Sequence, residues 1–284
     1  MLEIIFFLLI PFIALLYEGI FRKINARFQD RIGPPILQPF YDVMKLFEKK
    51  EIKNQNDPFF KYSPLLYFIS IYALFLFIPF SLISFEYDFI FVLYLTILGS
   101  AFYVLSGLSS DNPFGIIGSA REMILMIVYE ITLVVTVFSF IIKAGVLSFA
   151  DFNSTLLLLS LPISSIALFV TSMIEVHITP FDTTEAHTEI MAGAVTEYSG
   201  TNLALMNLSM ALKRLFFTLF LPMLFFGNNM LIIIPMSLIF LFIYIVMQAT
   251  TSRYRVDQAF KVYSIIMFLA LVELIIVMWG IKWV

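Results

Sequence analysis

The feature that most constrains this chain is a succession of apolar runs, each close to 20 residues long. Of its 284 residues, 61% are hydrophobic and only 13% are charged. A soluble domain of this size has too little interior to hide so much apolar surface. A helix of about 20 apolar residues crosses the ~30 Å hydrocarbon core of a bilayer with its backbone satisfied. The sequence therefore predicts an all-α, polytopic membrane helix bundle that forms a single membrane domain over residues 1–284.

Hydropathy predicts eight transmembrane helices, and the charges between them predict an orientation. The helices are expected near 2–21, 64–84, 89–108, 123–142, 154–175, 201–226, 230–249 and 263–283. Thirteen Lys and Arg residues flank these spans on one side, against only Lys143 and Lys282 on the other. By the positive-inside rule, both termini face outward. The cytoplasmic side then carries a long loop over 22–62, an acidic loop over 176–200 and a short loop over 249–262.

Composition also limits the chemistry that this chain can perform. Cysteine is absent, which excludes disulfides and any cysteine-ligated iron–sulfur cluster or zinc site. The two histidines, His177 and His187, stand among scattered carboxylates at a spacing that matches no standard metal site. A net charge of −3 gives no sign of a nucleic-acid partner. The first residues lack the basic region of a signal peptide and are expected to begin a retained helix. The chain is therefore expected to bind no cofactor of its own.

The loop over 22–62 begins with basic residues and continues as an amphipathic segment. Arg22, Arg27 and Arg31, with Gln29 among them, leave the first span at helical spacing until the IGPP sequence ends the helix. From Leu37 the apolar residues recur every three or four positions among lysines, which predicts a helix lying along the membrane interface. Attraction to anionic lipid explains this pattern, and so does the docking of a soluble subunit.

The stretch over 175–200 is rich in acid and contains no Lys or Arg. Acidic groups inside a membrane bundle or at its mouth are expensive, so they indicate proton or ion traffic. Three of the acids follow at offsets of three and four, which would stack them on one face of a helix that begins near Pro180. A capping role for Asp182 or Thr183 remains open. His187 fits a proton relay or a structural role equally, whereas His177 is expected to be structural. The candidate residues are Glu175, Asp182, Glu185, His187, Glu189 and Glu197.

Charged residues inside the predicted spans extend this candidate pathway. Glu130 follows Glu122 by eight residues, which places both on nearly the same face of a helix. An ion pair with Arg121 would account for Glu122, but Glu130 has no partner nearby in the sequence. Glu130 is therefore expected to exchange protons, and the alternative is a protonated side chain that bonds to a neighbouring helix.

Two adjacent cations, Lys213 and Arg214, lie half-way along the span at 201–226. They point about 100° apart, so one is expected to snorkel or pair with a glutamate while the other faces the interior. Lys213 is expected on the ion path, paired with Glu130 or Glu197. The expected path then runs through Glu130, Glu175 and Glu197. Glu273 also lies within a span but has only a weak connection to this path.

Three separated motifs resemble the NuoH/ND1 family, the membrane subunits that join complex I and energy-converting hydrogenases to their peripheral arms. The first is the loop pattern that runs from Arg27 through Gly33–Pro35 to Leu46. The second is PFDTTEAHTEI…EYSG over 180–200, and the third is RYRVDQ over 253–258. The resemblance covers nearly the whole chain, and the family's eight helices match the predicted number. It implies that the following residues dock the peripheral arm: Arg22, Arg27, Gln29, Arg31, Asp42, Lys45, Arg253, Arg255 and Asp257.

The departures from the quinone-using members favour the hydrogenase-type branch. The first loop is short, HITPFD stands where quinone members tend to have NRAPFD, and a residue near Met210 replaces a glutamate of those members. The resemblance implies a non-redox subunit of a prokaryotic plasma-membrane complex that couples electron transfer to H⁺ or Na⁺ movement. The implied partners are membrane lipid, NiFe-hydrogenase-like large and small subunits, antiporter-like subunits, and ferredoxin as electron donor. Iron–sulfur clusters and a NiFe centre would lie in those partners.

Three alternatives remain open for the function. In a quinone-reducing complex of the complex I type, the first helix and the cytoplasmic loops would form a chamber for the quinone headgroup. A relative with a nickel-free, sulfur-reducing arm would use the same kind of membrane subunit. A stand-alone secondary transporter is less favoured, because such proteins usually show inverted repeats, and this sequence shows none.

Overall fold

The computed structural model describes residues 2–51, 57–79, 82–149, 152, 157–183 and 191–280. All regular structure within these residues is helical. The long helices are α1 (Leu2–Phe28), α3 (Pro58–Ala73), α4 (Asp88–Leu108), α5 (Pro113–Ala144), α9 (Gly200–Phe226), α10 (Met230–Thr250) and α11 (Val256–Met278). The shorter ones are α2 (Gln38–Glu48), α6 (Leu157–Ser160), α7 (Pro162–Glu175) and the 3₁₀ turns η1 (Leu74–Leu76) and η2 (Gly193–Val195).

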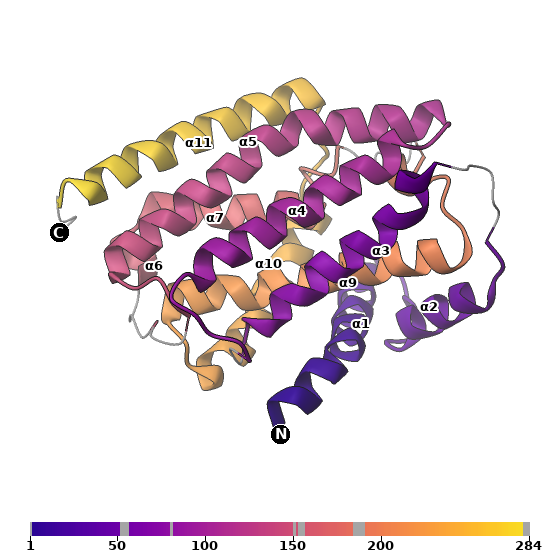
Figure 1. Ribbon diagram of the computed structural model, residues 1–284, viewed down its shortest axis with the longest axis horizontal. Helices are drawn as coiled ribbons and strands as arrows, with labels where there is room; N and C mark the ends of the chain where they lie inside the picture. Colours follow the sequence, from indigo (N-terminus) through magenta and orange to yellow (C-terminus); the bar gives the residue numbers. More distant parts are fainter. Residues whose placement is uncertain are drawn as a thin grey trace.

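The helices form a polytopic membrane bundle, as the sequence predicts (Figure 1). Seven helical stretches in the described part of the chain are long and apolar enough to span a bilayer, and α7 is a shorter apolar helix. The all-α fold class is thus confirmed, with α7 in the place of an eighth full span.

The continuous helix expected over 154–175 is wrong. Leu161 adopts a non-helical conformation between α6 and Pro162, so the segment breaks into two pieces. The longer piece, α7, has 14 residues and is about 21 Å long. A helix of that length does not cross the ~30 Å hydrocarbon core, so one of its ends must lie within the membrane.

Several spans extend further into the loops predicted to be cytoplasmic than hydropathy predicts. The first continues through Arg22 and ends at Phe28, because Asp30 takes a positive φ of 56° before Gly33. The fourth begins at Pro113, where the side chain of Asn112 accepts a hydrogen bond from the backbone of Phe114. The last begins at Val256, so Asp257 lies in its first turn rather than in a loop. Local capping chemistry thus moves each boundary beyond its apolar run.

The centre of the bundle is α9, and its neighbours surround it. Helices α1, α3 and α10 pack against it directly, and the amphipathic helix α2, expected from Leu37 onward, packs against its beginning. Helix α11 lies at the edge, along α5 and α7, and exposes most of its surface (Figure 1). Charged groups on α9 are therefore surrounded by protein, whereas those on α2 remain near the surface.

The predicted orientation can be tested with single cysteines, because the native chain contains none. Glu86, just before α4, and Lys50, just after α2, are both exposed and lie on opposite sides of the predicted topology. A membrane-impermeant maleimide applied to intact spheroplasts should label Glu86→Cys at once. Lys50→Cys should react only after permeabilisation. The opposite pattern would show that the charge bias assigns the wrong orientation.

Candidate functional site

A buried ion pair lies at the centre of the bundle. The Lys213 ammonium on α9 is 2.5 Å from Oε2 of Glu175, the last residue of α7, and both side chains are nearly inaccessible. The hydroxyl of Ser100 on α4 is 3.2 Å from the ammonium and 3.3 Å from the same carboxylate oxygen. The expectation that Lys213 pairs with Glu130 or Glu197 is wrong. Glu175 is its partner because the end of α7 meets α9 at that depth.

The end of α7 is shaped so that Glu175 sits in its final turn. The amide of His177 donates to Ile174 O (2.9 Å), and the amide of Ile178 donates to Met173 O (3.0 Å). These two bonds form a Schellman motif, in which the residue after the C-cap takes the left-handed conformation. His177 takes it with a φ of 54°, at a position where glycine is usual. Its ring lies 5.3 Å from that of Tyr103. The negative end of the helix dipole also favours the nearby Lys213 cation.

Two further carboxyls lie near this pair, and both come from α5. Glu130 is buried and interacts electrostatically with Glu175 and Lys213. The Ser100 hydroxyl, which contacts Lys213 and Glu175, also lies near the Glu130 carboxyl. Glu122 is also buried and accepts a 2.7 Å hydrogen bond from the Tyr129 hydroxyl, so the expected pairing with Arg121 does not explain its position. Three carboxyls thus gather around a single lysine.

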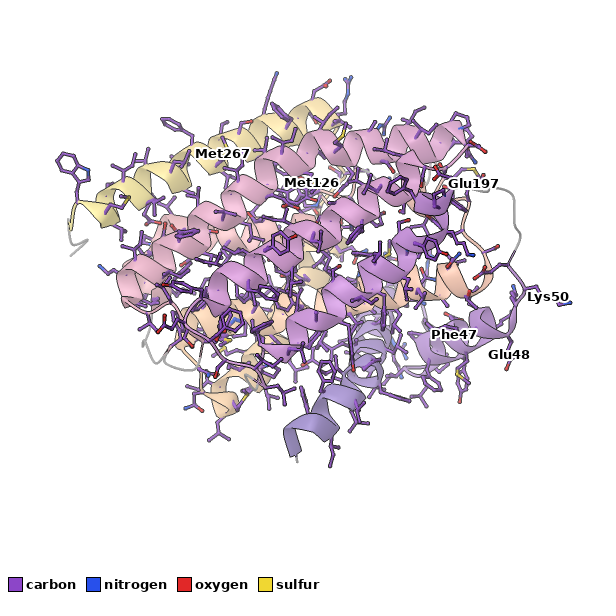
Figure 2. All side chains as sticks on the ribbon, viewed as in Figure 1. Phe47, Glu48, Lys50, Met126, Glu197 and Met267 are labelled. Carbon is purple, nitrogen blue, oxygen red and sulfur yellow. The ribbon has the colours of Figure 1, made fainter. Side chains whose placement is uncertain are left out.

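Glu197 does not belong to this cluster, contrary to the expected path. Its carboxylate accepts a 2.6 Å hydrogen bond from Asn112, at the very start of α5. Glu130 lies 18 residues further along the chain, which is about 27 Å along the helix axis. Glu197 lies at the same end of the bundle as Lys50 and Glu48, whereas Met126, one turn before Glu130, lies in the middle (Figure 2). Glu197 is therefore a surface-proximal acid.

Tyr198, next to Glu197, anchors this segment to the bundle. Its ring stacks on that of Phe60 at 4.4 Å, and its hydroxyl lies 3.1 Å from Phe60 O and Ser106 O. Burial raises the pKa of the Tyr198 phenol to about 12, so it remains a neutral donor at physiological pH. The position of Glu197 is consequently well defined even though it lies between helices.

The acidic loop is only partly described. Glu185, His187 and Glu189 lie outside the described residues, so their predicted roles stay predictions. Asp182 is described, and it accepts a 2.6 Å hydrogen bond from Arg253. Residues 180–183 are not helical, so a helix that begins at Pro180 is wrong for its first turn. The acidic loop has no basic residue of its own, but Arg253 from a distant loop compensates the charge of Asp182.

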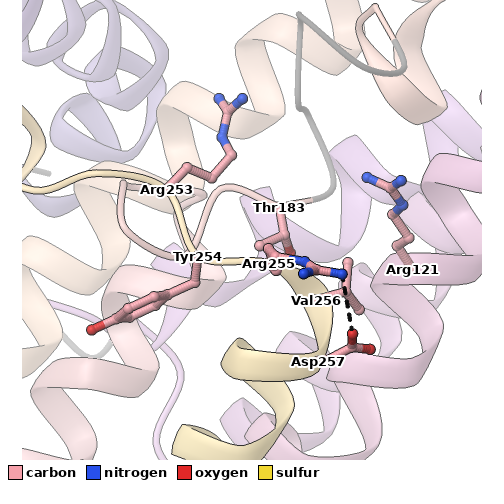
Figure 3. Close-up of a pocket in the computed structure, with 7 residues that line it drawn as sticks. All are labelled: Arg121, Thr183, Arg253, Tyr254, Arg255, Val256 and Asp257. Atoms are coloured by element: carbon pink, nitrogen blue, oxygen red, sulfur yellow. Dashed lines mark ion pairs between the residues drawn. The ribbon is translucent and has the colours of Figure 1, made fainter.

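A pocket of about 410 Å³ lies beside this contact (Figure 3). Arg121, Arg253 and Arg255 line it together with Thr183, Tyr254, Val256 and Asp257. Arg255 and Asp257 are highly exposed and only loosely paired, at 3.9 Å. Arg121 had no predicted role in docking, and no pattern in the sequence distinguishes it from an ordinary juxtamembrane cation. The structure places it with three of the predicted docking residues, Arg253, Arg255 and Asp257.

The docking residues predicted in the first loop lie at the surface, and none of them lines the arginine pocket. Arg27, Gln29 and Arg31 are exposed beyond the end of α1, and Lys45 is exposed on α2. Arg22 and Asp42 are half-exposed and lie 3.2 Å apart, so they are joined to each other. This pair connects α1 with α2.

Two buried acids have structural partners that sequence reasoning missed. Glu18 on α1 pairs with Arg214, the second of the adjacent cations on α9. Glu273 on α11 accepts hydrogen bonds from the amides of Ile163 (3.2 Å) and Ser164, in the first turn of α7. It thereby satisfies two of the free N–H groups at the start of α7. The proline at 162 was the available signal for that helix start.

Among the described residues, no group of three or more His, Asp or Glu side chains is placed to hold a metal ion. The cluster around Lys213 is suited to a different task. Carboxyls that share one cation in a low-dielectric interior exchange protons when that cation moves, because each depends on it for compensation. The arrangement of these side chains is therefore suited to the transfer of a proton or another cation rather than to catalysis on a substrate.

Comparison with known proteins agrees with the motifs. The NADH dehydrogenase family matches residues 2–278. The chain belongs to the NADH dehydrogenase (NuoH/ND1) family. Members of this family form membrane subunits of respiratory complexes, and this multi-pass chain is a subunit of that kind.

Relatives in the NuoH/ND1 family come from more than one type of complex. Hydrogenase-4 component C of Escherichia coli is 34% identical over 73% of this chain and 70% of its own length. The NuoH protein of the NADH-quinone oxidoreductase of Helicobacter acinonychis is 29% identical over 90% of this chain and 89% of its own. A chain of the membrane-bound sulfane sulfur reductase, an archaeal respiratory membrane complex, has the same fold. It has a TM-score of 0.86 at 24% identity and covers 96% of this chain and 98% of its own.

The Lys213–Glu175 pair makes a testable contribution to stability in this NuoH/ND1 family member. Lys213→Met should lower the free energy of unfolding by about 3–5 kcal/mol, because Glu175 is left as a buried charge without compensation. Adding Glu175→Gln should recover most of that loss, since the double variant buries no net charge. Unfolding by sodium dodecyl sulfate in mixed micelles measures the free energy of unfolding of the single and the double variant. Lys261→Met, at an exposed site of α11, is the control. Equal losses in the single and double variants would contradict the pairing.

Proposed function

We propose that this chain is the non-redox coupling subunit of a prokaryotic respiratory complex with a NiFe-hydrogenase-like peripheral arm. Electron transfer in that arm drives H⁺ or Na⁺ translocation through the membrane part. The observation that carries this proposal is the group of three buried carboxyls around Lys213, in a chain that belongs to the NuoH/ND1 family. Such groups are retained inside membranes chiefly for ion movement.

The hydrogenase-like arm rests on two observations. The first is the similarity to hydrogenase-4 component C, at 34% identity. The second is that this chain lacks residues typical of the quinone-using members, including their glutamate at the position near Met210. In this proposal, iron–sulfur clusters and a NiFe centre belong to the large and small subunits of the arm, ferredoxin donates the electrons, and antiporter-like subunits adjoin the bundle. Both termini face outward, and the loops that hold the docking residues face the cytoplasm.

The ion pathway is proposed to run from the cytoplasmic surface to the Lys213 cluster. Asp182, Glu185, His187 and Glu189 form its entrance, and Glu197 lies beside that entrance. A change in the docked arm shifts these groups, and Lys213 then changes its distance from Glu175. Glu130 lies within the field of both and takes up or gives off a cation as the pair loosens.

Neutral substitutions in the cluster test this function. Glu130→Gln and Glu175→Gln should each abolish ion uptake by proteoliposomes containing the intact complex, because an amide side chain neither binds nor releases a proton near neutral pH. The Glu130→Gln complex should still assemble, since glutamine has nearly the same shape. Assembly of the Glu175→Gln complex is measured first, because this variant leaves Lys213 without its buried partner. Glu86→Gln, an exposed acid near α4, is the matched control. Undiminished ion uptake in both cluster variants would remove these residues from the pathway.

A second prediction concerns the docking surface. Arg27→Ala and Arg255→Ala remove exposed cations from the first loop and from the arginine pocket. Each should reduce the amount of soluble subunits that co-purifies with the membrane part, with a larger loss at higher salt because exposed charges are screened. Lys143→Ala, exposed on the opposite side of the predicted topology, should leave co-purification unchanged. Loss in the Lys143 variant alone would reverse the assignment of the docking face.

A quinone-reducing complex is the second candidate, and one feature favours it. A largely apolar groove of about 260 Å³ lies between α1 and the start of α2 and is lined by Phe12, Leu15, Leu16, Ile36, Leu37, Phe40 and Tyr41. Nickel analysis of the native complex separates the two candidates when combined with a terminal-acceptor assay. Nickel with hydrogen evolution supports the hydrogenase-like arm. Inhibition by a quinone-site inhibitor, without nickel, supports quinone reduction.

A further inference from the structure

A second chain of charges leads from the cytoplasmic surface toward the Lys213 cluster. It begins on α2, where the Gln38 amide donates to Asp42 at 3.0 Å. Asp42 pairs with Arg22 on α1 at 3.2 Å, and Arg22 pairs with Glu18, one turn earlier, at 2.9 Å. Glu18 also pairs with Arg214 on α9. Acid and base alternate along this path, which passes through three helices.

The outer end of this chain is accessible, and its inner end is not. The side chains of Arg22 and Asp42 are each 44% exposed, whereas those of Glu18 and Arg214 are 13% and 15% exposed. Exposed pairs contribute little to stability, so the Arg22–Asp42 contact is poorly explained as a way to hold the fold together. The position of the Arg22–Asp42 pair is better explained by a role that requires α2 to be accessible at the surface of the bundle.

The inner end of the chain reaches the Lys213 cluster through a small cavity. Arg214 and Lys213 are adjacent on α9, and both line a cavity of about 50 Å³ together with Tyr67, Glu175, His177 and Met210. Two buried polar atoms, Oε1 of Glu175 and Nε of Arg214, lack a hydrogen-bond partner among the described residues. A polar cavity of this size has room for ordered water, and such atoms are the partners that water requires.

Arg214 is held by two contacts on its other side. Its guanidinium lies 4.2 Å from the centre of the Phe21 ring and pairs with Glu18. Glu18 is therefore shared between Arg214 and Arg22. When Arg22 approaches, it competes for the carboxylate and leaves Arg214 freer to turn toward the cavity and Glu175. When Arg22 withdraws toward Asp42, Glu18 holds Arg214 more firmly.

We propose that Glu18 is the positioning residue through which α2 controls the Lys213–Glu175 pair. A movement of α2 shifts Asp42 and Arg22, Glu18 passes this shift to Arg214, and Arg214 acts on Glu175 through water in the cavity. This inference rests on the proposed function, because it assumes that the Lys213 cluster transfers ions. It adds a site of control on α1 and α2 that is separate from the acidic loop.

The test uses the intact complex in proteoliposomes and measures ions moved per electron transferred. Reduced methyl viologen supplies electrons, its oxidation gives the electron rate, and a pH-sensitive dye and radioactive sodium follow the two ions. In Glu18→Gln the ratio of ions to electrons should fall about fivefold or more, the size of a typical coupling between two sites. Glu18→Asp keeps the charge and should recover most of the ratio. Glu48→Gln, an exposed acid on α2, is the matched control.

Asp42→Asn provides an independent variant, because its half-exposed side chain can be neutralised with little risk to the fold of this chain. It should lower the same ratio by at least about half in the complexes that retain their soluble subunits, because the ratio is counted per electron transferred and does not depend on how many complexes retain the arm. If Glu18→Gln does not assemble, Asp42→Asn tests the inference in its place. A lowered ratio of ions to electrons then supports the inference, and an unchanged ratio overturns it.

Failure of the proposed function and failure of the Glu18 role give different results. A wild-type complex that oxidises methyl viologen but moves neither ion contradicts the proposed function itself. A wild-type complex that moves ions, with an unchanged ratio in Glu18→Gln, overturns only the role of Glu18. A fall of equal size in Glu48→Gln also overturns it, because the effect would then follow from any loss of charge on this side of the bundle.

Discussion

A charge buried among lipid-facing helices has to be compensated within the protein, and this requirement determines how the centre of the bundle is built. Lys213 is compensated by Glu175, and this contact brings the last turn of α7 against α9. At the other end of α7, Glu273 of α11 accepts hydrogen bonds from the first free amides of the helix. Both ends of this helix, which is about 21 Å long, are thus satisfied within the protein: the first by the side chain of Glu273, and the last by the backbone bonds of the Schellman motif.

The functional candidate holds more acids than bases. Glu122, Glu130 and Glu175 are all buried near Lys213, but only Glu175 makes a direct ion pair with it. A fully paired network would hold its charges in position, whereas one cation shared among several acids can change partners at small cost. In this NuoH/ND1 family fold, α5 and α9 carry Glu122, Glu130 and Lys213 on buried positions of the bundle. Arg214, through Glu18, gives the surface helix α2 a connection to the same region.

Much of the fold was predictable from particular residues. The apolar runs predicted seven of the spans, and the spacing of Leu37, Phe40, Met44 and Phe47 predicted α2. Glu130 and Lys213 were selected because charges in a span are expensive, and both are buried in the structure. What failed was the choice of partners. Lys213 pairs with Glu175 rather than with Glu130 or Glu197, and Asp182 meets Arg253 from a loop some 70 residues away along the chain.

The sequence by itself determined that this chain is a membrane helix bundle with acids concentrated at one loop and placed singly within several spans. These properties follow from the hydrophobic effect and from the cost of burying charge, which depend on residue type and local spacing. Only the tertiary structure decided which acid meets which base, where the fifth span breaks, and that Glu18 reaches Arg214. Those outcomes depend on the depth at which helices far apart in sequence pack together. Hydropathy places a helix only to within a turn or so, whereas an ion pair requires atoms within a few ångströms.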